Sequence, residues 1–495
     1  MRVAKPARAV NQKIAVSVVF VLAMFMNIMD VTIVNVALPR LGHDLHVGTT
    51  AVAGVSIGYL VSLAVVIPAS GWLGDRFGSK RILMIAIVLF TGASALCGAA
   101  QSLDQLIAFR VLQGVGGGML TPVGMAMLFR TFPPAERVRA SSILVIPTAC
   151  APALGPVIGG LLVTDLSWRW VFYVNLPIGA LAIVFGLLFV REQDTEPASR
   201  FDTRGFVLSG LGFAGVMYGV SEGPQRGWHD TLVLTTIAVG AVLVVALIVT
   251  QLRTTDPLLR LSLFGDRLFR STTAVIFLGT AAFLGTLYLV ALFFQDGLGL
   301  SALDSGLSTF PEAIGVMLGA QVASRTLYPR LGPQRVMAGG LVGVAVCIGL
   351  MALVDGRDDM WPMRALMFLL GLCMANVFGP GQAAAFARVS HQNTARASTL
   401  FNALRQLGSA AGVAVLTSVI AGIGVTTSSG RPDLGAYHAG FLVAAGIAVL
   451  AALAALTIRD EDAASTRVRR VRAEQAEPVI GAVSDDAAAA PRHGS

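Results

Sequence analysis

Charged residues are scarce in this sequence. Asp, Glu, Lys and Arg make up only 13% of its 495 residues, whereas hydrophobic residues make up 55%. A soluble domain carries about 25% charged residues, so the composition excludes an ordinary soluble enzyme. It also excludes a disordered or collagen-like chain, because both have a low apolar content.

Lysine and cysteine are rare as well. The net charge is +8, but the only lysines are Lys5, Lys13 and Lys80, and no basic run is interleaved with aromatic residues. We therefore expect no nucleic-acid partner. The four cysteines form no CxxC pair and lie within apolar runs, which favours small buried side chains over metal ligands. The sequence predicts no metal site and no cofactor.

Motifs of soluble catalysis are missing too. The sequence has no Walker A lysine motif, so the chain is not expected to hydrolyse ATP. A GxSxG match at 54–58 and a GxGxxG match at 210–215 lie in long apolar runs, not in the strand-to-helix context that either motif requires. No cluster of polar residues falls at one depth of these runs, so we predict that the protein is not an enzyme.

Long apolar runs dominate instead. A transmembrane helix needs about 20 apolar residues, and a barrel strand needs only about ten alternating ones. Fourteen runs reach the helical length, so the sequence predicts an all-α integral membrane protein with fourteen transmembrane helices. The runs lie at about 14–38, 51–72, 82–100, 104–128, 140–163, 170–190, 203–221, 231–252, 270–296, 304–324, 335–354, 361–386, 395–421 and 435–457.

Basic residues are unevenly divided between the loops. If all fourteen runs cross the membrane, 28 Lys and Arg lie on the side of the two termini and six on the other, while Arg110 and Arg405 lie within runs. Cytoplasmic loops carry the excess of basic residues. We therefore expect both termini in the cytoplasm.

The sequence contains an internal repeat. A shift of 254 residues brings Arg76 onto Arg330 and Arg110 onto Arg364, and it maps the first six runs onto the last six. Duplicated halves around a central cavity are typical of transporters, so we predict two six-helix halves with two inserted central helices. The predicted segments are a cytoplasmic N-terminus at 1–13, an N-terminal bundle at 14–192, a two-helix insertion at 193–266, a C-terminal bundle at 267–458 and a disordered cytoplasmic tail at 459–495.

A glycine-rich loop follows the second run and reads GWLGDRFGSKR. Glycine permits close helix approach and tight turns, and a carboxylate at a helix end can pair with a basic group or a helix N-terminus. We predict that the basic residues of this loop latch onto acidic groups of the other half, and that breaking the latch lets the halves rock. The predicted gating residues are Gly71, Gly74, Asp75, Arg76, Gly78 and Arg81, with Lys80 beside them.

This loop resembles the signature of the major facilitator superfamily. Four further segments resemble the 14-helix drug:proton antiporter family within it, and they read DVTIVNVALP (30–39), LIAFRVLQGVGGG (106–118), ALGPVIGG (153–160) and WRWVFYVNLPIG (168–179). The chain departs from the family pattern at Gly74, where the family usually has alanine, and at Ala151, where it often has glycine. The resemblance implies a major facilitator fold and proton-driven export of drugs.

Asp30 is an acidic residue inside the first run. The shift of 254 residues aligns it with Leu284 in the other half. A charge inside the membrane costs about 2.5–3.5 kcal/mol, and burial favours the protonated form of a carboxyl group. We predict reversible protonation of Asp30, with Thr32 and Asn35 near enough to hydrogen-bond, and the resemblance ties this position to proton and drug coupling. The alternative is an Asp that is permanently paired inside the bundle.

Arg110 lies about six residues into the fourth run. A guanidinium cannot lose its proton, so it needs a partner or a wet cavity, and Asp30 is the candidate partner. The resemblance implies a proton-relay role for Arg110. The alternative is an arginine that snorkels to the outer surface.

Glycine and proline interrupt the fifth run at Gly155, Pro156, Gly159 and Gly160. Proline removes a backbone hydrogen bond and kinks a helix, and small residues let helices approach closely. The sequence alone predicts a hinge here, and the resemblance implies the antiporter motif of exporters. Ordinary helix packing is the alternative.

Two further charges lie inside runs of the C-terminal half. Glu312 stands beside Pro311 near the middle of the membrane, and Arg405 lies about ten residues into a later run. We predict that Glu312, Arg405 and Asn35 contact the substrate, with Arg405 as a possible partner of Glu312. A purely structural pair of these two residues is the alternative.

Together these features predict a proton-coupled exporter in the bacterial inner membrane, and a monomer that contacts membrane lipid. Small amphipathic or cationic molecules are the expected substrates, and protons are the expected driving ion. One alternative is an exporter of a specific endogenous metabolite, lipid or self-made antibiotic. A membrane-embedded enzyme and a transport-dead receptor are further alternatives, but the receptor predicts loss of Asp30 or Arg110, and both residues are present.

Overall fold

The computed structural model describes residues 11–47, 49–192, 200–424 and 433–466. These residues form helices joined by short connections. The first group of helices comprises α1 (Gln12–Asp44), α2 (Thr49–Phe77), α3 (Ser79–Ala99), α4 (Leu103–Thr131), α5 (Arg137–Asp165), the short α6 (Trp170–Tyr173) and α7 (Asn175–Phe189). The next two helices are α8 (Thr203–Arg226) and α9 (Thr231–Arg253). The last group comprises α10 (Arg267–Leu292), α11 (Ala302–Val322), α12 (Tyr328–Met351), α13 (Met360–Ala385), α14 (Thr394–Ile423) and α15 (Leu434–Ala455).

The helical character of the predicted runs is therefore correct, because a helix covers each of them. Eleven stretches of the described chain are long and apolar enough to cross a membrane, and one of these, Asp304–Met351, extends from α11 into α12. Many large apolar side chains also point outward, such as Leu188 and Val242 with 69% and 67% of their surface exposed. An apolar exterior of this kind suits lipid rather than water. The number of fourteen membrane spans stays a prediction.

The predicted repeat has a counterpart in the backbone. Gly78 separates α2 from α3 with φ +94°, and Gly332, 254 residues later, has φ +82° at a break inside α12. A positive φ is costly for any residue with a side chain. Both halves thus turn at the same place, although the predicted domain boundaries themselves are not tested by this match.

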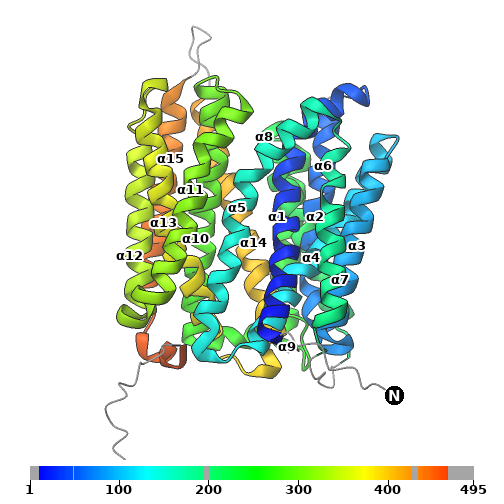
Figure 1. Ribbon diagram of the computed structural model, residues 1–495, viewed down its shortest axis with the longest axis vertical. Helices are drawn as coiled ribbons and strands as arrows, with labels where there is room; N and C mark the ends of the chain where they lie inside the picture. Colours follow the sequence, from blue (N-terminus) through cyan, green and yellow to red (C-terminus); the bar gives the residue numbers. More distant parts are fainter. Residues whose placement is uncertain (1–10, 48, 193–199, 425–432, 467–495) are drawn as a thin grey trace, which may run out of the picture.

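The helices form two groups that lie side by side (Figure 1). The first group contains α1 to α7 and the second contains α10 to α15, with α5 and α14 at the boundary between the two groups. α5 packs against α1 as well as α11 and α13, and α14 packs against α10 and α15 as well as α2 and α4. The two ends of the described chain lie at the same end of the molecule (Figure 1). We call that end the terminal face, and the other end the opposite face.

The inserted helices cover one seam between the groups. α8 packs against α2 of the first group and α14 of the second, and α9 packs on the outer side of α8. Only 17% of the most apolar stretch of α9 is buried inside the protein. α8 therefore bridges the two groups, and α9 is largely exposed.

The chain keeps its structure beyond the last long helix. The tail was predicted to be disordered from residue 459, but Asp460–Thr466 form a short helix whose Ala463 and Thr466 are buried. The Tyr328 hydroxyl bonds to Thr466 Oγ1 at 2.6 Å, and Asp462 pairs with Arg388 at 3.2 Å. These contacts fix the start of the tail, so the prediction is wrong for this segment. Residues 467–495 lie outside the described chain.

Candidate functional site

An ion pair lies inside the first group of helices. Arg110 Nη1 of α4 donates to Asp30 Oδ2 of α1 at 2.5 Å, and the two side chains are 1% and 0% exposed. A buried charge needs both a counter-charge and hydrogen bonds. The structure thus brings together the two residues that the sequence proposed as partners, and Arg110 does not snorkel to the surface.

The second carboxylate oxygen of Asp30 is also bonded. Oδ1 accepts from Gln113 Nε2 at 2.9 Å and from Asn175 Nδ2 at 3.0 Å. Gln113 lies one turn after Arg110 on α4, and its Oε1 accepts from Arg110 Nη1 at 2.7 Å. Asn175 is the first residue of α7. The carboxylate is therefore held by α4 and α7 together.

Arg110 has its own supports. Its Nε donates to the carbonyl of Val55 in α2 at 3.3 Å, and its guanidinium lies 4.3 Å from the centre of the Tyr59 ring. The Tyr59 hydroxyl donates to Asn27 Oδ1 of α1. A cation over an aromatic face is stabilised by the ring quadrupole. α2 thus adds two contacts that keep the guanidinium in place.

The network extends to α3. Asn175 Nδ2 donates to Ser94 Oγ at 3.1 Å, and Ser94 Oγ donates to the carbonyl of Phe172 at 2.8 Å. Asn175 Oδ1 is buried without a hydrogen-bond partner among the described residues. Side chains from α1, α2, α3, α4 and α7 therefore meet around one carboxylate.

Thr32 and Asn35 do not bond to Asp30, contrary to the prediction. Thr32 Oγ1 donates to the carbonyl of Met29 at 3.0 Å, and Asn35 accepts from Ser56 Oγ at 3.2 Å on an exposed surface. Successive helical residues are rotated by about 100°, so positions two and five residues after Asp30 point to other sides of α1. Whether Asn35 contacts a substrate stays a prediction.

The glycine-rich loop packs at the terminal face. A Cβ on Gly71 would lie 2.5 Å from Thr399 Oγ1 and 3.0 Å from the Ala395 carbonyl of α14, so only glycine allows this approach. Asp75 Oδ1 accepts from Arg130 Nη2 of α4 at 2.7 Å. A Cβ on Gly74 would meet nothing nearer than 3.7 Å, so Gly74 is not required by packing.

The predicted latch between the basic loop residues and the other half is absent from the described structure. The ion pairs found there include none from Arg76, Lys80 or Arg81, and Arg76 and Arg81 are exposed. The backbone of the loop makes the contact instead. Glu192 accepts from the amides of Lys80 and Arg81 at 2.9 and 3.1 Å, so it caps α3 within the same half.

The second half contains a matching acidic cap. Asp460 Oδ1 accepts from the amide of Gln334 at 2.9 Å, just after the turn at Gly332. In both halves the positive-φ glycine lies against the acid, and a Cβ on Gly78 or Gly332 would approach the carboxyl carbon to 2.7 or 2.5 Å. The first amides of a helix lack partners and attract a carboxylate. Both acids follow the last helix of their half, and no motif in the sequence marks them as partners of these turns.

The two groups of helices touch at the terminal face. Ser398 Oγ of α14 donates to the carbonyl of Pro122 in α4 at 2.8 Å, and Ser70 Oγ lies 3.4 Å from Thr399 Oγ1. A further hydrogen bond joins the Arg137 guanidinium to the carbonyl of Phe386. These contacts lie toward the ends of α2, α4 and α13 and the starts of α5 and α14. The terminal face is therefore closed in this structure.

The predicted hinge glycines are not equivalent. A Cβ on Gly155 would lie 2.1 Å from Thr32 Oγ1, and one on Gly159 would lie 2.9 Å from Ile33 Cγ1. A Cβ on Gly160 would meet nothing within 4 Å. The side chain of Pro156 lies outside the described part. α5 is a single helix from Arg137 to Asp165, so these glycines let it pack on α1, and a hinge role stays a prediction.

Glu312 and Arg405 do not form the predicted pair. Among the described ion pairs none contains either residue, and the Arg405 guanidinium makes one long hydrogen bond, of 3.5 Å, to Asn402 Oδ1. The helices explain the separation, because α11 packs against α13 and α5, whereas α14 packs against α10, α2 and α4. Glu312 is 4% exposed and lies where α11 crosses α13 at Gly371.

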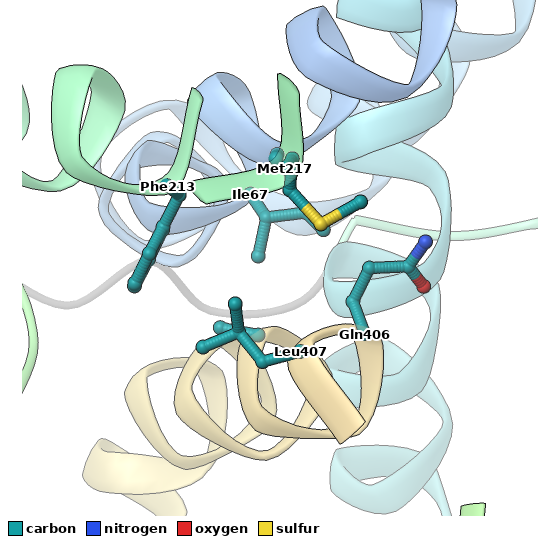
Figure 2. A pocket seen from close by; sticks show the side chains of 7 residues that line it. Ile67, Phe213, Met217, Gln406 and Leu407 are labelled. Carbon is teal, nitrogen blue, oxygen red and sulfur yellow. The ribbon is translucent and has the colours of Figure 1, made fainter. Parts of the chain in front are cut away.

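A small pocket lies under the inserted helix. Figure 2 shows side chains of α2, α8 and α14 converging on it, and its lining is apolar except for Gln406. The lining residues are Ala64, Ile67, Phe213, Met217, Ala403, Gln406 and Leu407. The pocket thus marks the seam where α8 joins the two groups.

Comparison with known proteins agrees with this arrangement. The model of the Major Facilitator Superfamily matches residues 20–413. The chain is 33% identical over 406 residues to the multidrug resistance protein B homolog of Mycobacterium tuberculosis (strain CDC 1551 / Oshkosh), which covers 81% of this chain and 75% of the relative. It is 31% identical over 395 residues to the tetracenomycin C resistance and export protein of Streptomyces glaucescens, which covers 79% and 73%.

Two further similarities extend over most of the chain. An uncharacterized MFS-type transporter of Bacillus subtilis (strain 168) is 31% identical over 418 residues, which is 83% of this chain and 77% of the relative. The crystal structure of a human organic anion transporter has a TM-score of 0.66 at 16% identity and covers 90% of this chain and 99% of that one. At this identity the structure shows the fold alone. The chain is therefore a multi-pass membrane transporter, not an enzyme, and it belongs to the Major Facilitator Superfamily.

Proposed function

We propose that the chain is a proton-coupled exporter that moves amphipathic or cationic compounds out of the cell by alternating access. The buried pair of Asp30 and Arg110 carries this proposal. Its carboxylate is the group that can take up a proton, since a guanidinium cannot release one. Coupling then rests on the charge state of Asp30.

Protonation of Asp30 would change the packing of three helices. Neutral Asp30 loses its charge attraction to Arg110, and its acceptor bonds from Gln113 and Asn175 weaken. Arg110 keeps the Val55 carbonyl and the Tyr59 ring. α1 is thereby released from α4 and α7, so that proton uptake lets these helices move relative to one another.

The route of the proton follows from the closed terminal face. Arg110 lies within about two turns of the start of α4 at the opposite face. Contacts such as Ser398 to Pro122 block the terminal face. We infer that the proton arrives from the opposite face, while substrate is bound from the terminal face after those contacts break.

Topology and assembly complete the proposal. We place the protein in the bacterial inner membrane with fourteen spans, both termini in the cytoplasm and lipid around a monomer. The 28 basic residues on the terminal side favour this orientation. Relatives named as multidrug resistance proteins support the export of drugs.

A second candidate is export of one endogenous compound. The relative from Streptomyces glaucescens is named for resistance to and export of a single compound. Such a protein would have the same coupling pair and a narrower substrate site. Only transport measurements with several compounds separate the two candidates.

The test uses inverted membrane vesicles that contain the full chain. With an imposed pH gradient, acidic inside, we expect the native protein to accumulate ethidium, and we expect no accumulation without the gradient. Asp30→Asn should abolish the gradient-driven part. Glu222→Gln is the matched control, because Glu222 is another buried acid that bonds to an arginine, Arg226, but it lies on α8 away from the network.

Two results would overturn the proposal. One is gradient-independent accumulation by the native protein, and the other is full accumulation by Asp30→Asn. If native protein and variant both insert and bind ethidium but neither moves it, export of a dedicated endogenous compound replaces drug export.

A further inference from the structure

Arg405 is a charged residue in the middle of α14 without a counter-charge. The residue is half-buried, but its Nε is buried without a hydrogen-bond partner among the described residues, and the one hydrogen bond of its guanidinium found there is the 3.5 Å contact to Asn402 Oδ1. Buried polar groups are nearly always satisfied, so each exception requires an explanation. A cation that cannot be neutralised by losing a proton requires one all the more.

No acid is placed to pair with Arg405. Of the buried acids in the described chain, Asp30 is already bonded to Arg110, and Glu312 lies on α11, which packs against other helices than α14. α10 and α15, which pack against α14, contain no Asp or Glu. The acids of α2, α4 and α8 lie near helix ends, at Asp75, Asp104 and Glu222. Among the described residues the guanidinium therefore has no counter-charge.

Arg405 faces the contact between the two halves. Ser398, Asn402 and Arg405 follow one another at helical spacing on one side of α14. Asn402 Nδ2 donates to the carbonyl of Ser398 at 2.9 Å and contacts Met125 of α4, and Ser398 Oγ donates to the carbonyl of Pro122. Arg405 is thus the next polar residue toward the opposite face, directly after the closed contact.

Gln406 follows Arg405 on α14 and is half-buried. Its side chain lines the pocket under α8, and Figure 2 shows its amide pointing away from Phe213. Within the described residues this amide has no hydrogen-bond partner. The Arg405 guanidinium by itself offers several donors and a single positive charge. That combination matches an oxyanion, which a planar guanidinium binds through two parallel hydrogen bonds.

We propose that Arg405 binds a carboxylate or similar oxyanion on the transported molecule. The proposal rests on the export function proposed above, and it adds a positive charge to the predicted substrate site. Substrates then include amphipathic acids and zwitterions besides cations. Asn402 orients the guanidinium and is itself bonded to Ser398. Arg405 is thus linked to the contact between Ser398 and Pro122 that closes the terminal face.

The test compares two probes that differ only in one charge. Dansyl-leucine carries a free carboxylate, and dansyl-leucine amide does not. Fluorescence titration of the purified full chain in detergent should give a lower Kd for dansyl-leucine than for the amide. Arg405→Gln should raise the Kd of dansyl-leucine by about ten-fold or more, as expected for a charge-assisted hydrogen bond, and should leave the Kd of the amide unchanged. Arg405→Lys should lose less affinity than Arg405→Gln.

The controls separate recognition from folding. Arg364→Gln removes another arginine of the same half, one that bonds to Ser308, and should not change the ratio of the two Kd values. Equal affinity of native protein for both probes would overturn the proposal, and so would an equal loss of both probes in Arg405→Gln. Ethidium accumulation in vesicles is measured in parallel. If the native protein accumulates no ethidium, the drug-export proposal fails, and the Kd comparison still decides the role of Arg405.

Discussion

At the scale of single residues, the pair of Asp30 and Arg110 responds differently to the loss of each partner. Without Arg110, the buried carboxyl group can take up a proton and become neutral. Without the Asp30 charge, Arg110 stays a buried cation. The two substitutions therefore have different costs, although they remove the same contact.

We predict that Asp30→Asn destabilises the protein more than Arg110→Gln. An uncompensated buried charge costs about 3–5 kcal/mol, and only Asp30→Asn leaves a charge that cannot be neutralised. The double variant should be more stable than Asp30→Asn, because it leaves no charge. The measurement is the midpoint of thermal unfolding of the purified chain at neutral pH. A lower midpoint for Arg110→Gln than for Asp30→Asn would contradict the prediction.

The sequence identifies this site only in part. Asp30 and Arg110 are conspicuous because a charge inside an apolar run is costly. Gln113 and Asn175 are uncharged, and they reach Asp30 from α4 and α7, so only the packing of those helices brings them to the carboxylate. Thr32 and Asn35 are near Asp30 in sequence, but the rotation of α1 directs them to other sides of the helix.

At the scale of elements, each half fixes its positive-φ glycine turn with an acid from the end of its last helix. Glu192 bonds to the amides at the start of α3, and Asp460 bonds to the amide of Gln334 in α12. The acid satisfies amides that the helix leaves unpaired and complements its dipole. Each turn is thus bonded to the segment that follows the last helix of its own half.

We predict that Gly78→Ala destabilises the protein and Gly92→Ala does not. A side chain at positive φ costs about 1–2 kcal/mol, and the new methyl group would also displace the Glu192 carboxylate. Gly92 is exposed on α3 with nothing within 4 Å of its Cβ position, and alanine there gains up to about 1 kcal/mol of helix propensity. Thermal unfolding midpoints compare the two variants. Equal midpoints would show that the turn is not constrained.

We also predict that the glycines of α5 tolerate substitution differently. Gly155→Ala places a methyl group 2.1 Å from Thr32 Oγ1, so α5 must move away from α1, whereas Gly160→Ala meets open space. Ethidium accumulation by Gly155→Ala should fall several-fold, and accumulation by Gly160→Ala should remain near the native value. A native rate for Gly155→Ala would contradict the packing argument.

Helix positions follow well from the sequence, and helix ends less so. The apolar runs locate every long helix because lipid and protein interior both require apolar residues. The residue that caps each helix end does not follow from the sequence. Glu192 lies 112 residues from Lys80, and nothing in the sequence pattern joins a residue after the sixth helix to the start of the third.

At the scale of the whole molecule, the structure is closed at the terminal face. Ser70 of α2 and Thr399 of α14 meet there across the two halves, with their hydroxyl oxygens 3.4 Å apart. Alternating access requires this contact to break. The pair therefore reports directly on the state of the transporter.

We predict that the double substitution Ser70→Cys and Thr399→Cys forms a disulfide that stops transport. Ethidium accumulation should be lost under oxidising conditions and return on reduction, because the bond holds the terminal face closed. Each single substitution is the control for the native cysteines, of which Cys97 and Cys347 are buried. Normal accumulation with the bond formed would show that this face does not open during transport.

The repeat predicts two halves, but it does not predict how they meet. The expected pair of Glu312 and Arg405 assumed that α11 and α14 are neighbours, yet they pack against different helices. The expected latch assumed contacts between charged side chains, whereas Gly71 approaches α14 through its backbone. Packing between halves depends on side-chain shape, which the repeat does not encode.

The position of α8 makes the two sides of the molecule different toward the lipid. α8 and α9 screen the seam between α2 and α14. α5 and α11 also pack against each other, and both carry exposed apolar side chains such as Leu161 and Leu318, with 55% and 51% of their surface exposed. A hydrophobic molecule dissolved in the bilayer therefore meets a shielded flank and a bare one. The two seams between the halves are therefore not equivalent toward the lipid, because the inserted helices cover the one between α2 and α14.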